Sequence, residues 1–133
     1  MIVVDTSVLV AILREEADAA DWIDLFDRTS KSLMSIVSYV ETSMVVYGRA
    51  GDTDPNEVTD LIEALRIEVL PVSLDQGEAA VAAFLRYGKG RHRAALNLAD
   101  CFSYALAKVR RAPLLYKGND FAMTDIVPAW QPQ

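Results

Sequence analysis

Apolar residues in this chain alternate between runs typical of strands and runs spaced as in helices. Ile2-Val3-Val4 is a continuous run of strand-forming residues, which indicates a short strand buried on both faces. Thr6 and Ser7 are good N-cap residues, so a helix is predicted to begin there and to run to about Arg14. Further strands are predicted at 32–35, 68–72 and 114–117, with 126–127 a candidate for a last strand. Further helices are predicted at 17–28, 37–47, 54–67, 74–85 and 95–109.

This alternation of strands and helices predicts an α/β fold in which a parallel sheet is covered by helices on both faces. The first strand is predicted to be central, and strand 68–72 to lie at or near an edge because it contains Pro71. Helix 54–67 is predicted to carry Pro55 in its first turn. A length of 133 residues without internal repeats or linkers predicts a single domain, 1–133.

Composition favours a globular, cytoplasmic protein. The chain is 52% hydrophobic and 24% charged, which is typical of a folded domain. Its single cysteine, Cys101, excludes an internal disulfide framework and fits a reducing compartment. We expect no signal peptide and no membrane span, because no apolar run reaches about 18 residues.

Charge is distributed unevenly along the chain. The net charge is -6, but residues 1–60 hold 12 acidic and 4 basic residues, whereas residues 61–133 hold 7 and 9. Basic residues gather around a predicted loop, among them Lys89, Arg91 and Arg93. An acidic protein can still bind phosphates on one basic face, so these residues are either a nucleic-acid contact or a solvated loop.

Four acidic residues occupy unusual places in the predicted elements. Asp5 follows the first strand, Glu41 lies early in a helix, Asp100 lies inside a mostly apolar helix, and Asp120 follows the fourth strand. Each could be structural by itself, and Asp5 could simply cap the next helix. If they converge, a divalent cation would offset their repulsion, and oxygen donors suit Mg²⁺ or Mn²⁺. Only one histidine and one cysteine are present, which disfavours a zinc site.

Four motifs at these acids resemble those of the PIN-domain ribonucleases, and most closely the VapC-type toxins of bacterial toxin–antitoxin pairs. The resemblance covers essentially the whole chain. It implies a PIN-like three-layer sandwich with a mainly parallel sheet of four to five strands. It also implies Mg²⁺- or Mn²⁺-dependent endonucleolytic cleavage of RNA, structured RNA such as tRNA or rRNA, by an activated water. The motifs are Ile-Val-Val-Asp5-Thr6-Ser7, Ser38-x-x-Glu41, Leu96-Asn97-x-x-Asp100-Cys-Phe-Ser-Tyr-Ala-Leu-Ala and Leu-Leu-Tyr-Lys117-Gly-Asn-Asp120-Phe.

The resemblance also assigns roles to individual residues. The catalytic and metal-binding acids fall on Asp5, Glu41, Asp100 and Asp120. Many relatives carry the fourth acid two residues earlier, where this chain has Gly118, so Asn119 or Asp125 are further candidates to complete the cluster. The supporting polar residues are Thr6, Ser7, Ser38, Asn97 and Asn119. Lys89, Arg91 and Arg93 are candidates for contact with the RNA backbone.

The same resemblance implies partners, and two alternatives remain beside it. It implies a homodimer neutralised by a cognate antitoxin, in a heterotetramer or a larger assembly, with a basic antitoxin side chain competing for the acidic pocket. One alternative is a catalytically inactive partner-binding module of the same fold. The other is a metal-dependent phosphatase, but a dehalogenase-like one would need an acid at Ser7. A receiver domain would need an aspartate at the end of strand 32–35.

Overall fold

Four short parallel strands form the centre of the structure, a computed structural model that describes residues 1–49, 51 and 54–130. They are β1 (Ile2–Val4), β2 (Ser32–Ser35), β3 (Ile67–Leu70) and β4 (Leu114–Leu115). The strand order is β3-β2-β1-β4, so β1 is an inner strand and β3 an edge strand, as predicted. The register pairs Val3 with Leu33 of β2 and with Leu114 of β4, and all three strand pairs are parallel.

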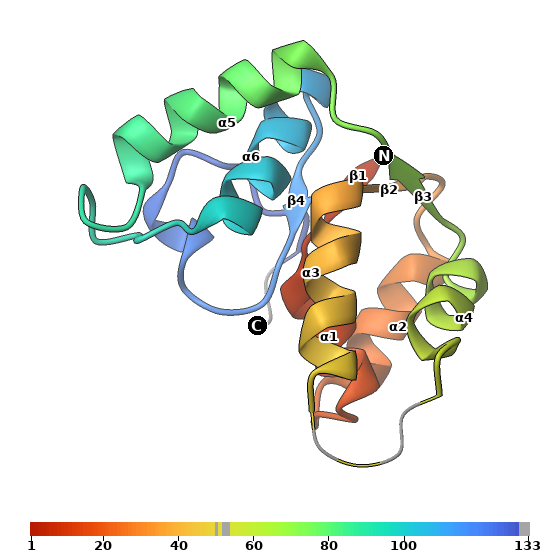
Figure 1. Cartoon of the computed structure of the whole chain (residues 1–133). Helices are drawn as coiled ribbons and strands as arrows, with labels where there is room; N and C mark the ends of the chain where they lie inside the picture. The colour runs from red at the N-terminus through yellow and green to blue at the C-terminus, as the bar shows by residue number, and fades with distance from the viewer. Residues whose placement is uncertain (50, 52–53, 131–133) are drawn as a thin grey trace.

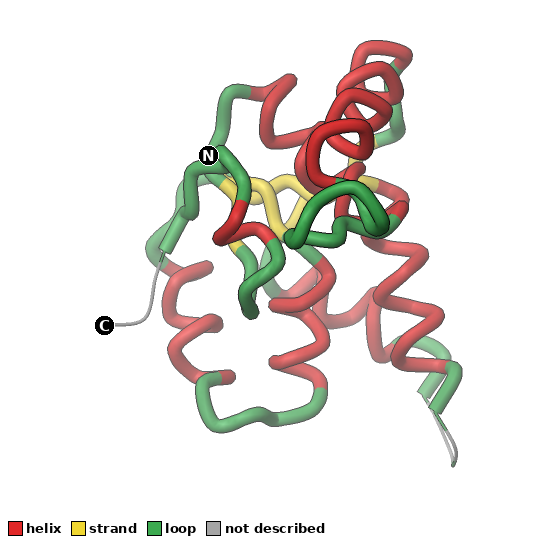
Figure 2. Tube along the Cα trace, turned by 90° about the vertical axis from the view of Figure 1, so that its left-hand side faces the viewer, coloured by secondary structure: helices red, strands yellow, loops and turns green. Residues whose placement is uncertain are grey.

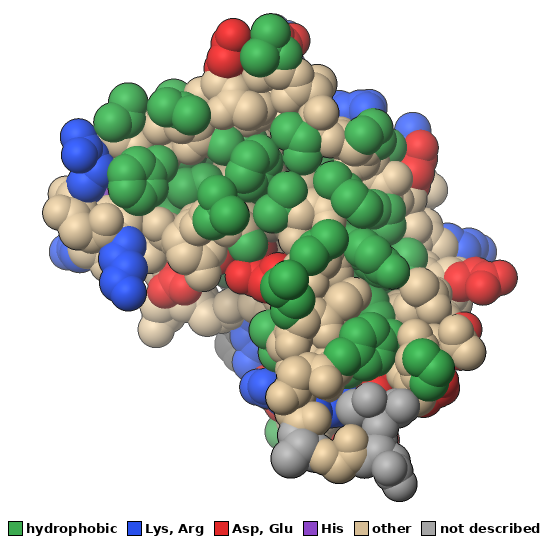
Figure 3. Space-filling view, viewed as in Figure 1, with side chains coloured by type: hydrophobic (Ala, Val, Ile, Leu, Met, Phe, Trp, Pro, Cys, Tyr) green, Lys and Arg blue, Asp and Glu red, His purple; other side chains and the backbone are tan. Residues whose placement is uncertain are grey.

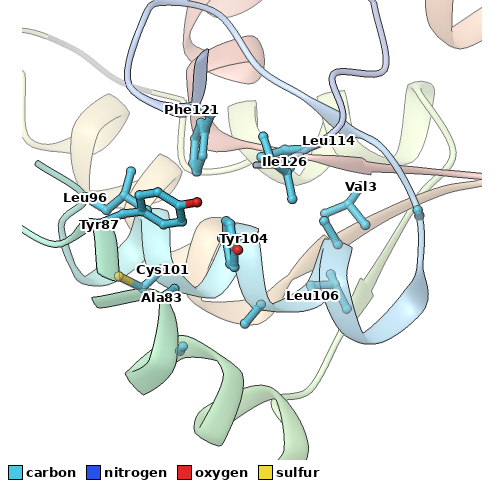
Figure 4. Close-up of a cluster of buried hydrophobic side chains, with 14 of the residues drawn as sticks. Val3, Ala83, Tyr87, Leu96, Cys101, Tyr104, Leu106, Leu114, Phe121 and Ile126 are labelled. Carbon is cyan, nitrogen blue, oxygen red and sulfur yellow. The ribbon is translucent and has the colours of Figure 1, made fainter. Parts of the chain in front are cut away.

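Successive residues of the strands enter two separate cores, one on each face of the sheet. Val3, Leu33 and Leu114 belong to one core, which Figure 4 shows together with Tyr87, Tyr104 and Phe121. Their neighbours in the strands, which include Val4, Met34 and Leu115, belong to the other core. Both faces of the sheet are buried because side chains alternate along a strand, and this explains the continuous apolar runs in the sequence.

Two groups of helices cover these two faces and make the fold a three-layer α/β sandwich (Figures 1 and 2). Buried side chains of α5 and α6 fill the first core, and those of α1 to α4 fill the second. A 3₁₀ turn, Phe121–Met123, follows β4. The helices are α1 (Thr6–Leu13), α2 (Ala19–Asp27), α3 (Ile36–Tyr47), α4 (Glu57–Ala64), α5 (Leu74–Tyr87) and α6 (Leu98–Arg110).

Helix α1 begins at Thr6 as predicted, with Asp5 rather than Thr6 or Ser7 as its N-cap, which accepts from the Ser7 N–H. The predicted helix start at residue 54 is wrong, and a local hydrogen bond explains why. Pro55 precedes α4, since the Asp54 carboxylate accepts from the Asn56 N–H and forms a turn there.

The start of α6 and that of α2 also differ from prediction. Residues 95–97 lie outside α6, because Ala95 has a left-handed φ of 52° and Asn97 caps the helix. Asp100 is therefore in the first turn of α6 and not in its interior. Helix α2 is shorter than the predicted range 17–28.

The strands near the C-terminus are shorter than predicted. Strand β4 ends at Leu115, and the candidate strand 126–127 is replaced by an isolated bridge between Leu114 and Pro128. Strand β3 ends before Pro71, which has no N–H to donate to a neighbouring strand. The chain between α3 and α4 includes residues 50, 52 and 53, which lie outside the described residues. Within the described part of the chain, no helix is long and apolar enough to cross a membrane.

Candidate active site

An acidic cavity of about 230 Å³ opens at the carboxyl ends of β1 and β4. Parallel strands end at the same edge of their sheet, and ligands of open α/β sheets bind there. The four acids singled out in the sequence all line this cavity, together with Thr6, Ser7 and Lys117. Val10, Val45 and Phe121 complete the lining. The structure therefore brings together carboxylates that are up to 115 positions apart in the sequence.

Asp5 is buried at the centre of this cluster, with only 4% of its surface exposed. Its Oδ2 accepts from the Ser7 N–H at 3.0 Å and from the Ser7 hydroxyl at 2.7 Å. The Ser7 Oγ also accepts from the Lys117 N–H at 2.9 Å, which ties the segment after β4 to the start of α1. Asp5 thus caps α1 and also faces the cavity, so the two interpretations of this residue are compatible.

A row of buried hydroxyl groups lies behind Asp5. The Ser103 hydroxyl on α6 donates to Asp5 Oδ1 at 2.7 Å, and the Ser38 hydroxyl on α3 lies 2.9 Å from Ser103 Oγ. The Thr6 hydroxyl donates to the Ser38 carbonyl at 2.9 Å, and Thr42 lies beside both. Ser38 and Thr6 were predicted as supporting residues. Ser103 and Thr42 were missed, because nothing in the local sequence shows which hydroxyl groups lie near Asp5.

Asp100 is held at the mouth of the cavity by a capping box at the start of α6. Its backbone N–H donates to Asn97 Oδ1 at 2.8 Å, and its Oδ2 accepts from the Asn97 N–H at 3.0 Å. This reciprocal pair fixes the rotamers of both side chains. Asn97, predicted as a supporting polar residue, is thus bonded to Asp100 through both its backbone N–H and its side chain. Cys101, the next residue, is buried and free.

Two of the four acids, Asp100 and Glu41, have raised pKa values, to which burial and the charges of neighbouring acids contribute. Burial raises the pKa of Asp100 to about 7; the hydrogen bond from the Asn97 N–H opposes this shift, and the charges of Asp5, Glu41 and Asp120 add to it. Burial also raises the pKa of Glu41, a polar contact with Thr6 offsets part of this rise, and the charge of Asp5 adds to it. Carboxylates this close repel one another and favour either a shared proton or a cation.

The segment after β4 brings Asp120 to the cavity through a turn at Gly118. Gly118 has φ of +103°, a region that L side chains rarely adopt, so an acid at this position would strain the backbone. Asp120 lines the cavity, whereas Asn119 is exposed and is not among the lining residues. The geometry therefore favours Asp120 over Asn119 as the fourth acidic group.

Asp125 lies outside the cavity lining and has a different partner set. It accepts a hydrogen bond from the Tyr104 hydroxyl and one from Lys108 Nζ at 2.9 Å, and Arg86 lies 3.5 Å away. Burial alone would raise the pKa of Asp125, but these hydrogen bonds and positive charges hold it below its usual range. Asp125, a further candidate to complete the cluster, therefore uses its carboxylate to anchor the C-terminal segment to α5 and α6.

The predicted basic contacts also lie outside the acidic cavity. Lys89, Arg91 and Arg93 are exposed in the turn between α5 and α6, and the Arg91 Nε donates to the Leu85 carbonyl. Lys117 is the one basic residue among those that line the cavity, and its ammonium is paired with Glu16 at 2.7 Å and Asp18 at 3.0 Å. Neither partner lines the cavity. The Lys117 ammonium is therefore paired with acids outside the cluster of four, and no other basic residue lines the cavity.

The donor set fits a hard divalent cation that is bound partly through water. Carboxylate oxygens are the ligands that Mg²⁺ and Mn²⁺ prefer, and a cation would relieve the repulsion that adds to burial in raising the pKa of Asp100. Among the described residues, however, no group of three or more His, Cys, Asp or Glu side chains is arranged to hold a metal ion. Mg²⁺ commonly keeps several waters and uses only one or two carboxylates directly, so the arrangement suits an ion bound partly through water.

Comparison with known proteins identifies the family. Residues 2–127 match the model of the PIN domain. The chain is 46% identical over 124 residues to ribonuclease VapC30 of Mycobacterium tuberculosis H37Rv, covering 93% of this chain and 95% of that protein. It is also 46% identical over 124 residues to ribonuclease VapC of Mycolicibacterium smegmatis, covering 93% of this chain and 96% of that protein. The chain therefore belongs to the PIN-domain family, among the VapC ribonucleases.

Solved structures support the same fold. The crystal structure of Mycobacterium tuberculosis VapC20, a toxin that cleaves the sarcin–ricin loop, matches with a TM-score of 0.76 at 20% identity. The match covers 96% of this chain and 97% of VapC20. A toxin–antitoxin complex from Klebsiella pneumoniae contains a chain that matches with a TM-score of 0.70 at 19% identity, covering 94% and 93% of the two chains. The PIN fold predicted from the sequence is confirmed.

Proposed function

We propose that this protein is a divalent-metal-dependent endoribonuclease, the toxin of a toxin–antitoxin pair that acts in the cytoplasm. The observation that carries the proposal is the convergence of Asp5, Glu41, Asp100 and Asp120 on one cavity of a PIN fold. The relatives at 46% identity are named ribonucleases, which supports RNA as the substrate class. Structured RNA such as tRNA or rRNA is the proposed target, in line with the substrate of VapC20.

In this proposal the carboxylates hold Mg²⁺, with Mn²⁺ as the alternative ion. A divalent cation supplies an activated water for attack on phosphorus and stabilises negative charge on the phosphate. Asp5, Asp100 and Asp120 provide oxygen ligands, directly or through water. Glu41, which also lines the cavity, orients the attacking water, and burial together with the charge of Asp5 raises its pKa, which favours uptake of a proton.

The basic residues of the turn between α5 and α6 are proposed to bind the RNA backbone. Lys89, Arg91 and Arg93 are exposed and lie away from the acidic cavity, so they would contact phosphates remote from the scissile bond. Figure 3 shows Lys and Arg side chains at the edge of the visible face near this turn. Contacts of this kind are electrostatic, so the affinity for RNA should fall as the salt concentration rises.

Cleavage of RNA is expected to depend on a divalent cation. Total bacterial RNA should be cut at a small number of positions in Mn²⁺ or Mg²⁺, and EDTA should abolish the cuts. Asp5→Asn, which keeps the shape of the side chain but removes its charge, should abolish them as well. Equal cleavage by the wild type and Asp5→Asn, or cleavage that survives EDTA, would contradict the proposal; absence of cleavage by all of them would favour the inactive partner-binding module.

We further propose that an antitoxin segment docks in an apolar groove that continues from the acidic cavity. The groove has a volume of about 690 Å³, and Glu41 lines both spaces. Met44 and Leu98 stand at the groove with 71% and 73% of their surfaces exposed. Figure 3 shows the hydrophobic side chains that cover this face. An occupant with apolar residues followed by an arginine or lysine would match both parts. The groove is lined by Ile36, Val37, Val40, Glu41, Met44, Val45, Asn97, Leu98 and Ala99.

Met44→Glu is expected to release the toxin from its antitoxin while RNA cleavage is retained. A charge in the apolar groove would cost about 1–3 kcal/mol of binding, because it would be desolvated without a partner. Binding of the product of the adjacent gene can be measured by calorimetry. Leu74→Glu is the matched control, because Leu74 is equally exposed but lies outside the groove. Equal weakening by both substitutions would argue against this docking site.

Light scattering on the same samples would test the proposed homodimer and its larger assembly with antitoxin.

A further inference from the structure

Ser103 contacts the acidic cluster from the buried interior of the protein, through a hydrogen bond to Asp5. It lies on the inner side of α6, its side chain is fully buried, and its hydroxyl reaches across to the end of β1. The other buried side chains of α6 are apolar, with the exception of the Tyr104 hydroxyl. A polar group in such a place is costly unless it is hydrogen-bonded, and Ser103 is bonded to two partners.

Counting hydrogens fixes the direction of this hydrogen-bond chain. A serine hydroxyl has one hydrogen to donate, and the Ser103 hydrogen goes to Asp5 Oδ1 because a carboxylate can only accept. The 2.9 Å contact with Ser38 must then be donated by the Ser38 hydroxyl to Ser103 Oγ. The chain therefore runs from Ser38 on α3, through Ser103 on α6, to Asp5 beyond β1.

The same counting shows what is left for a cation. A carboxylate offers about four acceptor positions. Three positions on Asp5 are taken, by the Ser103 hydroxyl, the Ser7 hydroxyl and the Ser7 N–H. Asp5 is thereby held in one rotamer with about one acceptor position, on Oδ1, left free.

We infer that Ser103 is a positioning residue for the metal ligand Asp5, and that Ser38 acts through it. The inference rests on the proposed function, since it concerns the affinity of the same carboxylates for the cation. Groups that orient a metal ligand from behind typically contribute 10- to 100-fold to metal affinity or activity. Ser103 does not touch the reacting atoms, so its effect is on how well the site is assembled.

Mn²⁺ binding to the full chain, measured by calorimetry, tests this inference. Ser103→Ala should raise the Kd for Mn²⁺ by about 10-fold and raise the Mn²⁺ concentration needed for half-maximal cleavage to a similar extent. Its unfolding temperature without metal should fall as well, because buried Asp5 Oδ1 and Ser38 Oγ each lose a partner. Ser103→Thr keeps the hydroxyl and should restore the Mn²⁺ affinity, even if its extra methyl group lowers the unfolding temperature. A purely structural serine would lower the unfolding temperature in both variants and leave the Kd for Mn²⁺ at the wild-type value.

Ser38→Ala provides a second variant and a test of coupling. It should weaken Mn²⁺ binding by a few-fold in the wild type and by less than about 2-fold in Ser103→Ala, because its effect is transmitted by Ser103. Ser43→Ala is the matched control, since the Ser43 hydroxyl on the same helix donates only to the Tyr39 carbonyl.

Two negative outcomes can be told apart. If the wild type binds Mn²⁺ and cleaves RNA but Ser103→Ala and Ser38→Ala bind Mn²⁺ with the wild-type Kd, the role of Ser103 is overturned and the proposed function stands. If the wild type neither binds Mn²⁺ nor cleaves RNA, the proposed function is wrong, and so is this inference, which depends on it.

Discussion

Asp100→Asn is expected to abolish RNA cleavage and, at the same time, to stabilise the metal-free protein at pH 8. Removing a group that hydrogen-bonds to a metal ligand typically lowers metal affinity or activity 10- to 100-fold. Removing a charge that lines the cavity itself should therefore lower the cleavage rate more than about 100-fold. The gain in stability comes from the same charge, which burial and three neighbouring acids make unfavourable. Asparagine keeps the oxygen that accepts from the Asn97 N–H, so the capping box is retained.

The stability effect should depend on pH in a defined direction. The pKa of Asp100 is about 7 in the folded protein and near 3.8 when unfolded. The folded state therefore binds the proton more tightly, and the free energy of unfolding falls as the pH rises from about 4 to about 7. After allowance for solvent screening of a partly exposed group, the gain in Asp100→Asn at pH 8 is about 1–2 kcal/mol.

Thermal unfolding without metal, at pH 4 and pH 8, measures this effect. Asp100→Asn should unfold about 3–8 °C above the wild type at pH 8 and close to it at pH 4. Asp24→Asn, a change of an exposed acid on α2, is the matched control and should have little effect at either pH. Destabilisation by Asp100→Asn at pH 8 would mean that the Asp100 charge is not under repulsion.

The affinity for Mn²⁺ is expected to be about 100-fold lower at pH 5 than at pH 8. A cation must displace the proton that Asp100 holds below pH 7, so binding weakens about 10-fold for each unit below that value. Calorimetry in buffers of different ionisation enthalpy should also detect release of about one proton at pH 6. A Kd that is the same at pH 5 and pH 8 would show that no protonated carboxylate takes part in binding.

The first two strands and the place of Asp5 at the sheet edge could be predicted because they depend on local patterns. Ile2-Val3-Val4 is buried on both faces, as its continuous apolar run indicated, and Asp5 follows it at the sheet edge. Residues 32–35 form β2 with the predicted bounds. These features follow from side-chain alternation and from the common edge where parallel strands end.

Features that depend on hydrogen bonds between distant segments could not be predicted in the same way. Asp100 was predicted to lie inside a helix that begins at residue 95. The helix begins three residues later, because Ala95 is left-handed and Asn97 caps the helix with Asp100 in its first turn. Asp125 looked like a possible site residue, and only the fold shows that Tyr104 and Lys108 bind its carboxylate. The contact between Ser103 and Asp5 spans 98 positions and has no local signature.

Mn²⁺ binding to single-charge variants tests most directly whether the acids form one cation site. Calorimetric titrations of Asp5→Asn, Glu41→Gln and Asp120→Asn should each give a Kd at least about 10-fold above that of the wild type, with Asp24→Asn unchanged. If all three variants bind Mn²⁺ with the wild-type Kd, the carboxylates that line this cavity do not share a cation, and the proposed catalytic site is wrong.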